Sequence, residues 1–222
     1  MKKIAFAALL GSCLVLPTSA FCADFDFNGN FGHDNDVREF SFSLGAAANL
    51  TLFTSSWVSG RFDPILTLWD SAGNQLFEQD DGGLTGTALS NGTVYQYGEF
   101  DNFLVVNLAA GNYVATLTQY DNFSATNQLS AGFLRDSEPF FTSAFGCTNG
   151  QFCEGSLVDS QNNPIQLNRS SAWDIHLLNV DSAALIAVPV PEMPISMLLG
   201  LAAMAGLSLA NTKRFSAKLY TA

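Results

Sequence analysis

Two pairs of aspartates are the residues in this chain whose type and spacing best suit metal binding. Asp34 and Asp36 lie in HDND, and Asp80 and Asp81 lie in EQDDGG, both beside residues that favour loops. Calcium takes about six to eight oxygen ligands, mainly from carboxylates and backbone carbonyls. The two pairs form a candidate calcium site if the fold brings them together; the alternative is that all four are solvated turn residues. We interpret three further aspartates as turn residues: Asp63, Asp70 and Asp101.

Catalytic chemistry has few candidate residues. The sequence contains no GxSxG, HExxH or P-loop motif, and no GxGxxG between an expected strand and helix. Asp174 and His176 lie two residues apart on one face of an expected strand, where a triad would need a serine from another element. An isolated histidine on a strand is more often structural. We expect that the protein is not an enzyme, and we keep a secreted hydrolase as an alternative.

Four aromatic residues have the chemistry for binding sugars, because an aromatic face offers apolar area to a sugar ring. At strand spacing, such residues more often fill the core or pair across strands. Together with the aspartate pairs, they leave a calcium-dependent carbohydrate-binding module as a further alternative. These aromatic residues are Trp57, Trp69, Tyr95 and Tyr97.

Two cysteines predict a local disulfide. Cys147 and Cys153 lie in GCTNGQFCEG with five residues between them. A structural zinc site usually has four cysteine or histidine ligands, and the only histidines, His33 and His176, are far away in the sequence. If the chain is exported to an oxidising compartment, we expect the two cysteines to be bonded to each other.

The charge of the central sequence excludes nucleic acid as a partner. Residues 24–190 contain four basic and 19 acidic residues, and 4 − 19 gives a net charge of −15. Such a field repels phosphate backbones and attracts cations. This charge favours solubility outside the cell and binding of divalent cations.

Alternation of apolar and polar residues predicts strands throughout the central sequence. In REFSFSL, three apolar residues alternate with serines, and NYVATLTQY shows the same period. Turn-forming pieces rich in Gly and Asn separate these stretches. We predict an all-β fold, an antiparallel two-sheet sandwich that is jelly-roll-like, over residues 37–188. We expect residues 24–36 to form a loose N-terminal arm and 136–168 to be an elaboration of the sandwich.

The N-terminus has the layout of a secretory signal peptide. Lys2 and Lys3 precede an apolar run over 4–16, and small residues follow. We assign residues 1–23 to the signal peptide and leave three cleavage positions open: after Ala20, after Cys22 and after Ala23. The alternative is a lipoprotein signal in which Cys13 carries the lipid.

The C-terminus contains a marginal membrane-spanning segment. Residues 195–210 are an apolar run of 16 residues, which span about 24 Å as a helix, whereas the hydrocarbon core of a bilayer is about 30 Å thick. Lys213 and Arg214 follow, and they orient the segment with its basic end in the cytoplasm. An ordinary short C-terminal anchor remains an alternative to a temporary one.

A series of central segments resembles a known domain. DVREFSFSL, NLTLFTSSW, FDPILTLWDSAGNQLFEQDDGG and LAAGNYVATLTQYDNF follow one another over residues 36–123. They resemble the bacterial pre-peptidase C-terminal domain, in the form found in PEP-CTERM exported proteins. The resemblance implies a β-sandwich, and some members of that wider class bind calcium, collagen or polysaccharide.

The tail over 189–222 resembles the PEP-CTERM sorting signal, in which Pro-Glu-Pro precedes an apolar segment and a basic end. Pro191, Glu192 and Met193 stand at the motif, with Met in place of the final Pro, and Lys213 and Arg214 at the basic end. The resemblance implies Sec export, transient retention in the inner membrane and cleavage by an exosortase-type enzyme. The protein would then be placed at the cell surface or in extracellular polymer, such as polysaccharide. We therefore expect an exported, non-catalytic protein with a structural or adhesive role.

Overall fold

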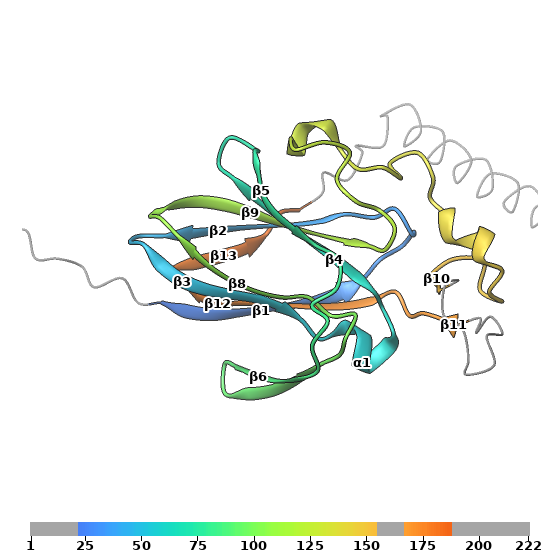
Figure 1. The fold of residues 1–222 in the computed structure, drawn as a ribbon, viewed down its shortest axis with the longest axis horizontal. Helices are drawn as coiled ribbons and strands as arrows, with labels where there is room; N and C mark the ends of the chain where they lie inside the picture. The colour runs from blue at the N-terminus through green and yellow to red at the C-terminus, as the bar shows by residue number, and fades with distance from the viewer. Residues whose placement is uncertain (1–21, 155–166, 188–222) are drawn as a thin grey trace, which may run out of the picture. The chain divides into compact units, whose positions relative to one another are not determined.

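The computed structural model describes residues 22–154 and 167–187, and in these residues the chain is an all-β protein with antiparallel sheets. Two larger sheets form the two layers seen in Figure 1. The four-stranded sheet has the order β1 (Ala23–Asn30), β12 (Ala172–Val180), β3 (Ala48–Thr54), β8 (Phe103–Leu108). The five-stranded sheet has the order β13 (Ser182–Leu185), β2 (Arg38–Leu44), β9 (Gly111–Gln119), β4 (Pro64–Asp70), β5 (Gln75–Gln79).

The predicted alternation is visible in the strands. In β2, Phe40, Phe42 and Leu44 are buried, whereas the serines between them are partly exposed. This is the pattern of a strand with one face on a core. Strand β4 is buried along nearly its whole length, and Pro64 stands at its first position, where a missing backbone N–H is tolerated.

The core lies between the two larger sheets. Phe40 of the five-stranded sheet packs edge-on against Trp173 of the four-stranded sheet, with ring centroids 5.7 Å apart. Leu50, Leu52 and Ile175 of the four-stranded sheet belong to the same buried cluster as Leu66. Strands that are far apart in the sequence therefore share one hydrophobic core.

A hairpin covers part of the outer face of the four-stranded sheet. Strands β6 (Gly86–Ser90) and β7 (Thr93–Tyr97) are joined by a turn in which Asn91 and Gly92 have positive φ values, 47° and 78°. Its Tyr95 ring contacts His176 of β12 at 4.0 Å between centroids. The hairpin lies beside the short helix α1 (Ser56–Gly60), as Figure 1 shows.

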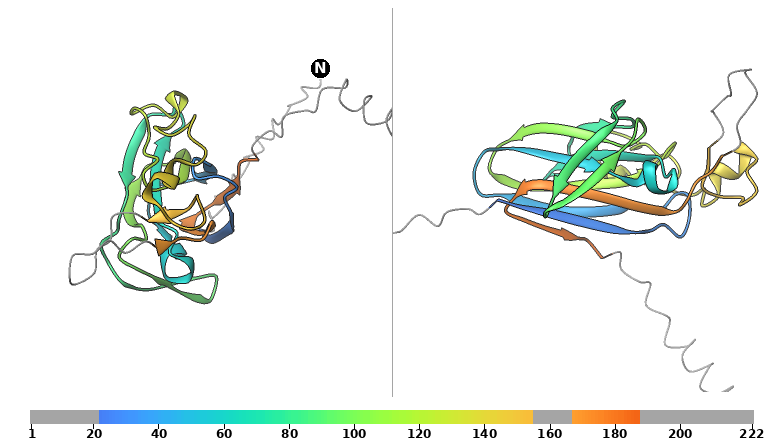
Figure 2. Two further views of the ribbon diagram at one scale, coloured as in Figure 1. Left: turned by 90° about the vertical axis from the view of Figure 1, so that its right-hand side faces the viewer. Right: turned by 90° about the horizontal axis from the view of Figure 1, so that it is seen from below.

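Loops carry the remaining elements, which are the 3-10 turns η1 (Leu129–Ala131) and η2 (Phe141–Phe145) and the two-residue strands β10 (Cys153–Glu154) and β11 (Leu167–Asn168). Leu129 N of η1 donates to Gly73 O, so η1 lies by the turn between β4 and β5. Figure 2 shows η2, β10 and β11 gathered beyond the ends of the sheet strands. Part of the expected elaboration over 136–168, residues 155–166, lies outside the described residues.

The N-terminal arm differs from the expectation. We predicted a loose arm over 24–36, but Ala23–Asn30 form β1, which pairs antiparallel with β12 at the edge of the four-stranded sheet. The sequence ADFDFNGN supplies the reason: Phe25 and Phe27 alternate with polar residues and both pack against the core. Residues 31–36 contain no strand.

The signal peptide, apart from residues 22 and 23, and the sorting signal over 189–222 lie outside the described residues. That includes Pro191, Glu192, Met193, Lys213 and Arg214. No helix within the described ranges is long and apolar enough to cross a membrane. Contacts divide the chain after Ile186, and all the strands named above belong to the first unit.

Candidate functional site

Three carboxylates meet at one end of the five-stranded sheet. Asp63, Asp80 and Asp81 each offer an oxygen, and these oxygens all lie within 4.8 Å of one another. Strands β4 and β5 pair antiparallel with Leu66 opposite Gln79. The residue before β4 and the two residues after β5 are therefore brought to the same end of the hairpin.

Two oxygens of this carboxylate cluster have no hydrogen-bond partner among the described residues. Asp63 is 3% exposed, and its Oδ2 accepts a bond from Arg169 Nη2 at 2.9 Å, while its Oδ1 is buried and unpartnered in the described structure. Asp80 Oδ1 is likewise buried and has no hydrogen-bond partner in the described structure. Buried polar atoms are normally bonded, so such exceptions need an explanation. A bound cation would provide one.

Asn102 adds a further oxygen near the cluster. Its side-chain amide donates to the backbone carbonyls of Gln79 and Asp80, which fixes the end of β5 against the loop before β8. Its own Oδ1 is buried and has no partner in the described residues. The surroundings of the cluster are thus rich in oxygen atoms that a hard cation prefers.

Burial and mutual repulsion hold these carboxyls in an unusual state. Burial raises the pKa of Asp63 to about 8, against the opposing charge of Arg169 and with reinforcement from neighbouring carboxylates. Burial and the charge of Asp81 raise the pKa of Asp80 to about 7. The pKa of Asp81 is also raised, chiefly by burial. When the three carboxyl groups are all ionised, the single positive charge of Arg169 does not neutralise them.

The donor set fits a divalent cation. Three ionised carboxylates and one guanidinium carry −3 + 1 = −2, which a single divalent ion balances. The available atoms are all oxygens, which suits calcium rather than zinc. Asp63, Asp80 and Asp81 would hold the ion, and its effect would be to join the start of β4 to the end of β5.

The structure brings together only part of the aspartate set that we considered. Asp80 and Asp81 lie in the carboxylate cluster, but Asp34 and Asp36 do not belong to it. Asp63, which we interpreted as a turn residue, takes their place. The sequence signal that would have found it is that Asp63 directly precedes one strand of the hairpin, whereas Asp80 directly follows the other.

Asp34 binds the protein backbone instead. It is fully buried, and its carboxylate accepts bonds from Thr142 N, Thr142 Oγ1 and Phe152 N at 2.6–3.0 Å. Asp36 accepts from Gly32 N at 2.7 Å and faces Arg38. Their role as calcium ligands stays a prediction, but the contacts of Asp34 already satisfy both of its oxygens.

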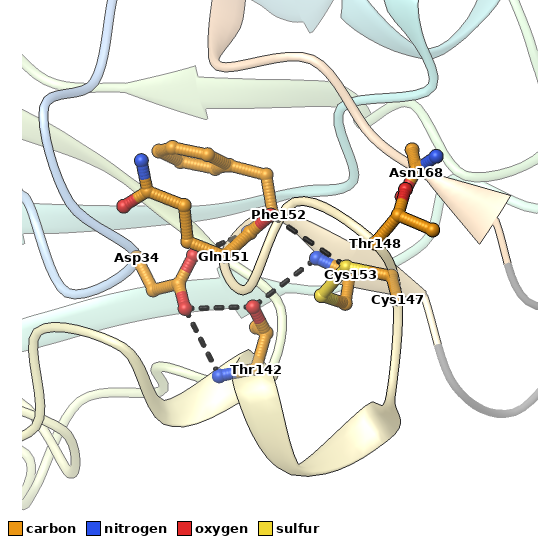
Figure 3. Close-up of a disulfide and its surroundings, with 8 residues drawn as sticks. All are labelled: Asp34, Thr142, Cys147, Thr148, Gln151, Phe152, Cys153 and Asn168. Carbon is orange, nitrogen blue, oxygen red and sulfur yellow. Dashed lines mark hydrogen bonds between the residues drawn. A yellow bond between two sulfur atoms is a disulfide. The ribbon is translucent and has the colours of Figure 1, made fainter.

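The predicted disulfide between Cys147 and Cys153 is confirmed. Figure 3 shows it beside Asp34 and Thr142, whose hydroxyl accepts a bond from Cys153 N at 3.1 Å. Phe152, next to Cys153, accepts the backbone bond of Arg169 at 2.7 Å. The disulfide loop therefore connects the buried Asp34 to the segment that carries Arg169.

Two further aspartates have the turn roles that the sequence predicted. Asp70 accepts bonds from the backbone of Ala72 and Asn74 and from the Asn74 amide, and these bonds lower its pKa. Asp101 is buried and accepts bonds from Thr54, Ser56, Trp57 and Gly98. Asp70 holds its own turn, whereas Asp101 joins its own turn at Gly98 to the distant segment 54–57 at the start of α1.

The aromatic candidates have most of their ring faces occupied by the protein. Trp69 is fully buried and donates to Thr116 Oγ1 at 3.0 Å. Trp57 packs on Phe100 with centroids 4.3 Å apart, and Tyr95 and Tyr97 lie against Phe53. These contacts favour the packing interpretation over a sugar-stacking surface.

His176 has a different acidic partner from the one expected. Its Nδ1 lies 2.7 Å from Asp26 Oδ1 of β1, and its Nε2 lies 2.9 Å from Ser55 Oγ. Asp174, two residues before it, is half-buried, and burial raises its pKa. Asp174 lines a pocket that Ser55 also lines. Sequence reasoning missed Ser55 and Asp26, because cross-strand register places them beside His176.

Comparison with known proteins gives no family for this chain. No protein-family model matches it, and no curated protein is similar to it at a significant level.

Proposed function

We propose that this chain is an exported β-sandwich protein with a structural or adhesive role at the cell surface or in extracellular polymer, and that calcium fastens one end of the sandwich. The observation that carries the calcium part is the cluster of Asp63, Asp80 and Asp81, in which two buried oxygens lack hydrogen-bond partners within the part of the chain that the structure describes. This role requires no catalysis. We propose that the two larger sheets have a jelly-roll topology, with strands β1-β12-β3-β8 in one layer and β2-β9-β4-β5 in the other.

Several features support export. The N-terminal sequence has the layout of a Sec signal, the tail resembles a PEP-CTERM signal, and the central sequence is strongly acidic. The disulfide between Cys147 and Cys153 suits an oxidising compartment. In this proposal the C-terminal segment holds the chain in the inner membrane until an exosortase-type enzyme cleaves it near Pro191 and Glu192.

Intact-mass analysis of the protein recovered from its native host tests the export proposal. Loss of the leader, loss of the tail, a lipid on Cys13 and the disulfide each change the mass by a distinct amount. We expect the leader and the tail to be absent and the disulfide to be present. Replacing Pro191 and Glu192 with alanine should make the uncleaved chain accumulate in membranes. Unchanged release of that variant would contradict a role for the motif.

A calcium-dependent carbohydrate-binding module is the second candidate, and a surface groove favours it. A groove of about 390 Å³ lies along the five-stranded sheet, lined among others by Ser41, Ser43, Ser182, Asn112 and Ser71. Hydroxyl and amide groups of this kind can bond sugar hydroxyls. The test is retention on immobilised polysaccharide with calcium and with chelator. Retention that survives the chelator, or no retention at all, would dispose of this candidate.

A further inference from the structure

A chain of hydrogen bonds crosses three neighbouring strands on the outer face of the four-stranded sheet. Ser55 Oγ lies 2.9 Å from His176 Nε2, and His176 Nδ1 lies 2.7 Å from Asp26 Oδ1. The register explains the meeting: Asp26 on β1 is opposite His176 on β12, which is opposite Phe53 on β3, two residues before Ser55. Serine, histidine and carboxylate thus occupy the relative positions of a nucleophile, a base and its orienting acid.

The carboxylate of Asp26 is held in place by other side chains. Ser90 Oγ donates to its Oδ1 at 2.5 Å, and Asn91 Nδ2 donates to its Oδ2 at 2.8 Å. Burial raises the pKa of Asp26, but bonds from Asn91, Ser90 and His176 outweigh it and the pKa is lowered. Asp26 is therefore an ionised acceptor, and His176 donates to it through Nδ1–H.

His176 is a neutral base in a fixed orientation. It is 1% exposed, and burial lowers its pKa, although the charges of Asp26, Asp174 and Asp101 oppose that effect. Phe53 and Tyr95 contact the ring at 4.3 Å and 4.0 Å between centroids. Because Nδ1 carries the proton, Nε2 is free to accept the proton of the Ser55 hydroxyl.

A pocket gives substrate access to this serine. Ser55 lines a pocket of about 430 Å³ between α1 and the β6–β7 hairpin. Val58 and Val94 line it as well and are 51% and 64% exposed. Ser55 itself is 7% exposed. A structural triad would not need a cavity beside its serine, whereas a nucleophile does.

We propose that Ser55 is a nucleophile that accepts the acyl group of a short, uncharged ester. The Ser55 oxygen attacks the ester carbonyl while His176 Nε2 takes the hydroxyl proton. The bond to the alcohol then breaks, and the proton passes from Nε2 to the departing alcohol. Water, deprotonated by the same nitrogen, attacks the acyl-serine; the acid leaves and the serine regains its proton. This inference goes beyond the proposed function and does not depend on it.

The lining of the pocket sets the class of ester. The two valines suit a short apolar acyl chain, and Asp174 disfavours an anionic substrate. The amides of Ser56 and Trp57 already donate to Asp101, so they do not stabilise an oxyanion. Thr87 and Gln96, exposed residues that pair across the β6–β7 hairpin, are the polar side chains on the hairpin side of the pocket.

Labelling of the full-length protein with a fluorophosphonate tests the proposal. The Ser55 oxygen would displace fluoride from phosphorus, and mass spectrometry of peptides would locate the adduct. We expect one adduct, on Ser55, and hydrolysis of p-nitrophenyl butyrate by the same protein. Ser55→Ala and His176→Ala should each reduce the rate of labelling and the rate of ester hydrolysis at least about 100-fold. An unlabelled Ser55 in protein that retains its melting temperature would overturn the proposal, as would labelling that His176→Ala does not slow.

Ser171→Ala is the matched control. Ser171 lies just before β12 and outside the pocket, and its hydroxyl donates to Asn30 Oδ1 at 3.2 Å. Its loss should leave the rates of labelling and hydrolysis within about twofold of wild type. Asp26→Asn tests the positioning residue: hydrolysis should slow, and the midpoint of its pH profile should move down because His176 loses a neighbouring negative charge. A slower rate with an unmoved midpoint would assign Asp26 to folding alone.

Ser55→Cys covers the case in which Ser55→Ala fails to fold. A thiol at this position would be activated by His176 and should react with iodoacetamide at pH 7 several times faster than Cys22, an exposed cysteine of the same chain. A thiol at position 55 that reacts no faster than Cys22 would mean that His176 does not act as a base.

Discussion

Arg169 and Asp63 form a buried ion pair in which only one carboxylate oxygen is used. Arg169 Nη2 donates to Asp63 Oδ2 at 2.9 Å, and both residues are 3% exposed. The other oxygen of Asp63 has no hydrogen-bond partner in the described residues. The same aspartate therefore connects the loop before β12 to the carboxylate cluster.

Breaking this ion pair should destabilise the protein strongly. At a pH above about 8, where Asp63 is ionised, Arg169→Met leaves the buried carboxylates without their counter-charge, and we expect the free energy of unfolding to fall by about 3–5 kcal/mol in urea denaturation. Arg38→Met is the control, because Arg38 faces Asp36 in a partly exposed pair at 3.3 Å and should contribute less than about 1 kcal/mol of pair energy. Equal losses in the two variants would contradict a special role for the buried pair.

The pH dependence of stability should change with calcium. In chelator, the folded pKa values of Asp63 and Asp80, about 8 and about 7, exceed the ordinary 3.8, so the folded chain binds more protons across that range. Their contribution to stability therefore falls as pH rises from about 4 towards 8. Calcium binds the deprotonated form and should flatten this decline. Melting temperatures over that range, with chelator and with calcium, measure the effect; superimposable curves would contradict it.

Acid should weaken the contacts of His176. Its folded pKa is lowered below the ordinary 6.5, so the unfolded chain binds more protons as pH falls past 6.5, and stability is lost in that direction. The lowered pKa of Asp26 acts in the same sense at lower pH. The variant His176→Gln should lose less stability than wild type between pH 7 and 5. If urea denaturation shows that wild type and His176→Gln lose the same free energy of unfolding between pH 7 and pH 5, His176 does not titrate in that range.

Removal of the disulfide should loosen one end of the sandwich. Replacing Cys147 and Cys153 with serine opens a small loop, and we expect a loss of about 2 kcal/mol. Because Phe152 N donates to Asp34, hydrogen exchange at that amide should speed up, whereas the amides of β2 should be less affected. Cys22→Ser removes an unpaired cysteine and should leave the exchange unchanged. Slow exchange at Phe152 in the disulfide-free variant would contradict this coupling.

Local sequence patterns were enough to predict most of the strands, but they did not predict which strands pair. The alternation in β2 and β9 is set by which side of a strand is buried, and this can be read from consecutive residues. The same alternation is present in β1, but Asp, Asn and Gly have low strand propensity, so we expected a loop. Pairing with β12 outweighs that propensity.

The candidate site depends on register, which consecutive residues do not specify. Asp80 and Asp81 were identified from a turn, but Asp63 joins them only because β4 and β5 pair with Leu66 opposite Gln79. Likewise, the sequence offers Asp174 as a candidate partner of His176 because the two are close in sequence, whereas Asp26 reaches His176 from the neighbouring strand. Contacts between distant segments were therefore the part that the sequence alone left open.

Calcium titration of metal-stripped, full-length protein by calorimetry near pH 8 is the most direct test of the proposed calcium site. We predict one calcium ion per chain and a rise in melting temperature on binding. Asp81→Asn, which changes the most exposed ligand, should abolish binding without unfolding the chain, and Asp36→Asn should retain it. A wild-type titration without binding heat and without a melting shift would contradict the account, as would binding lost in Asp36→Asn but kept in Asp81→Asn.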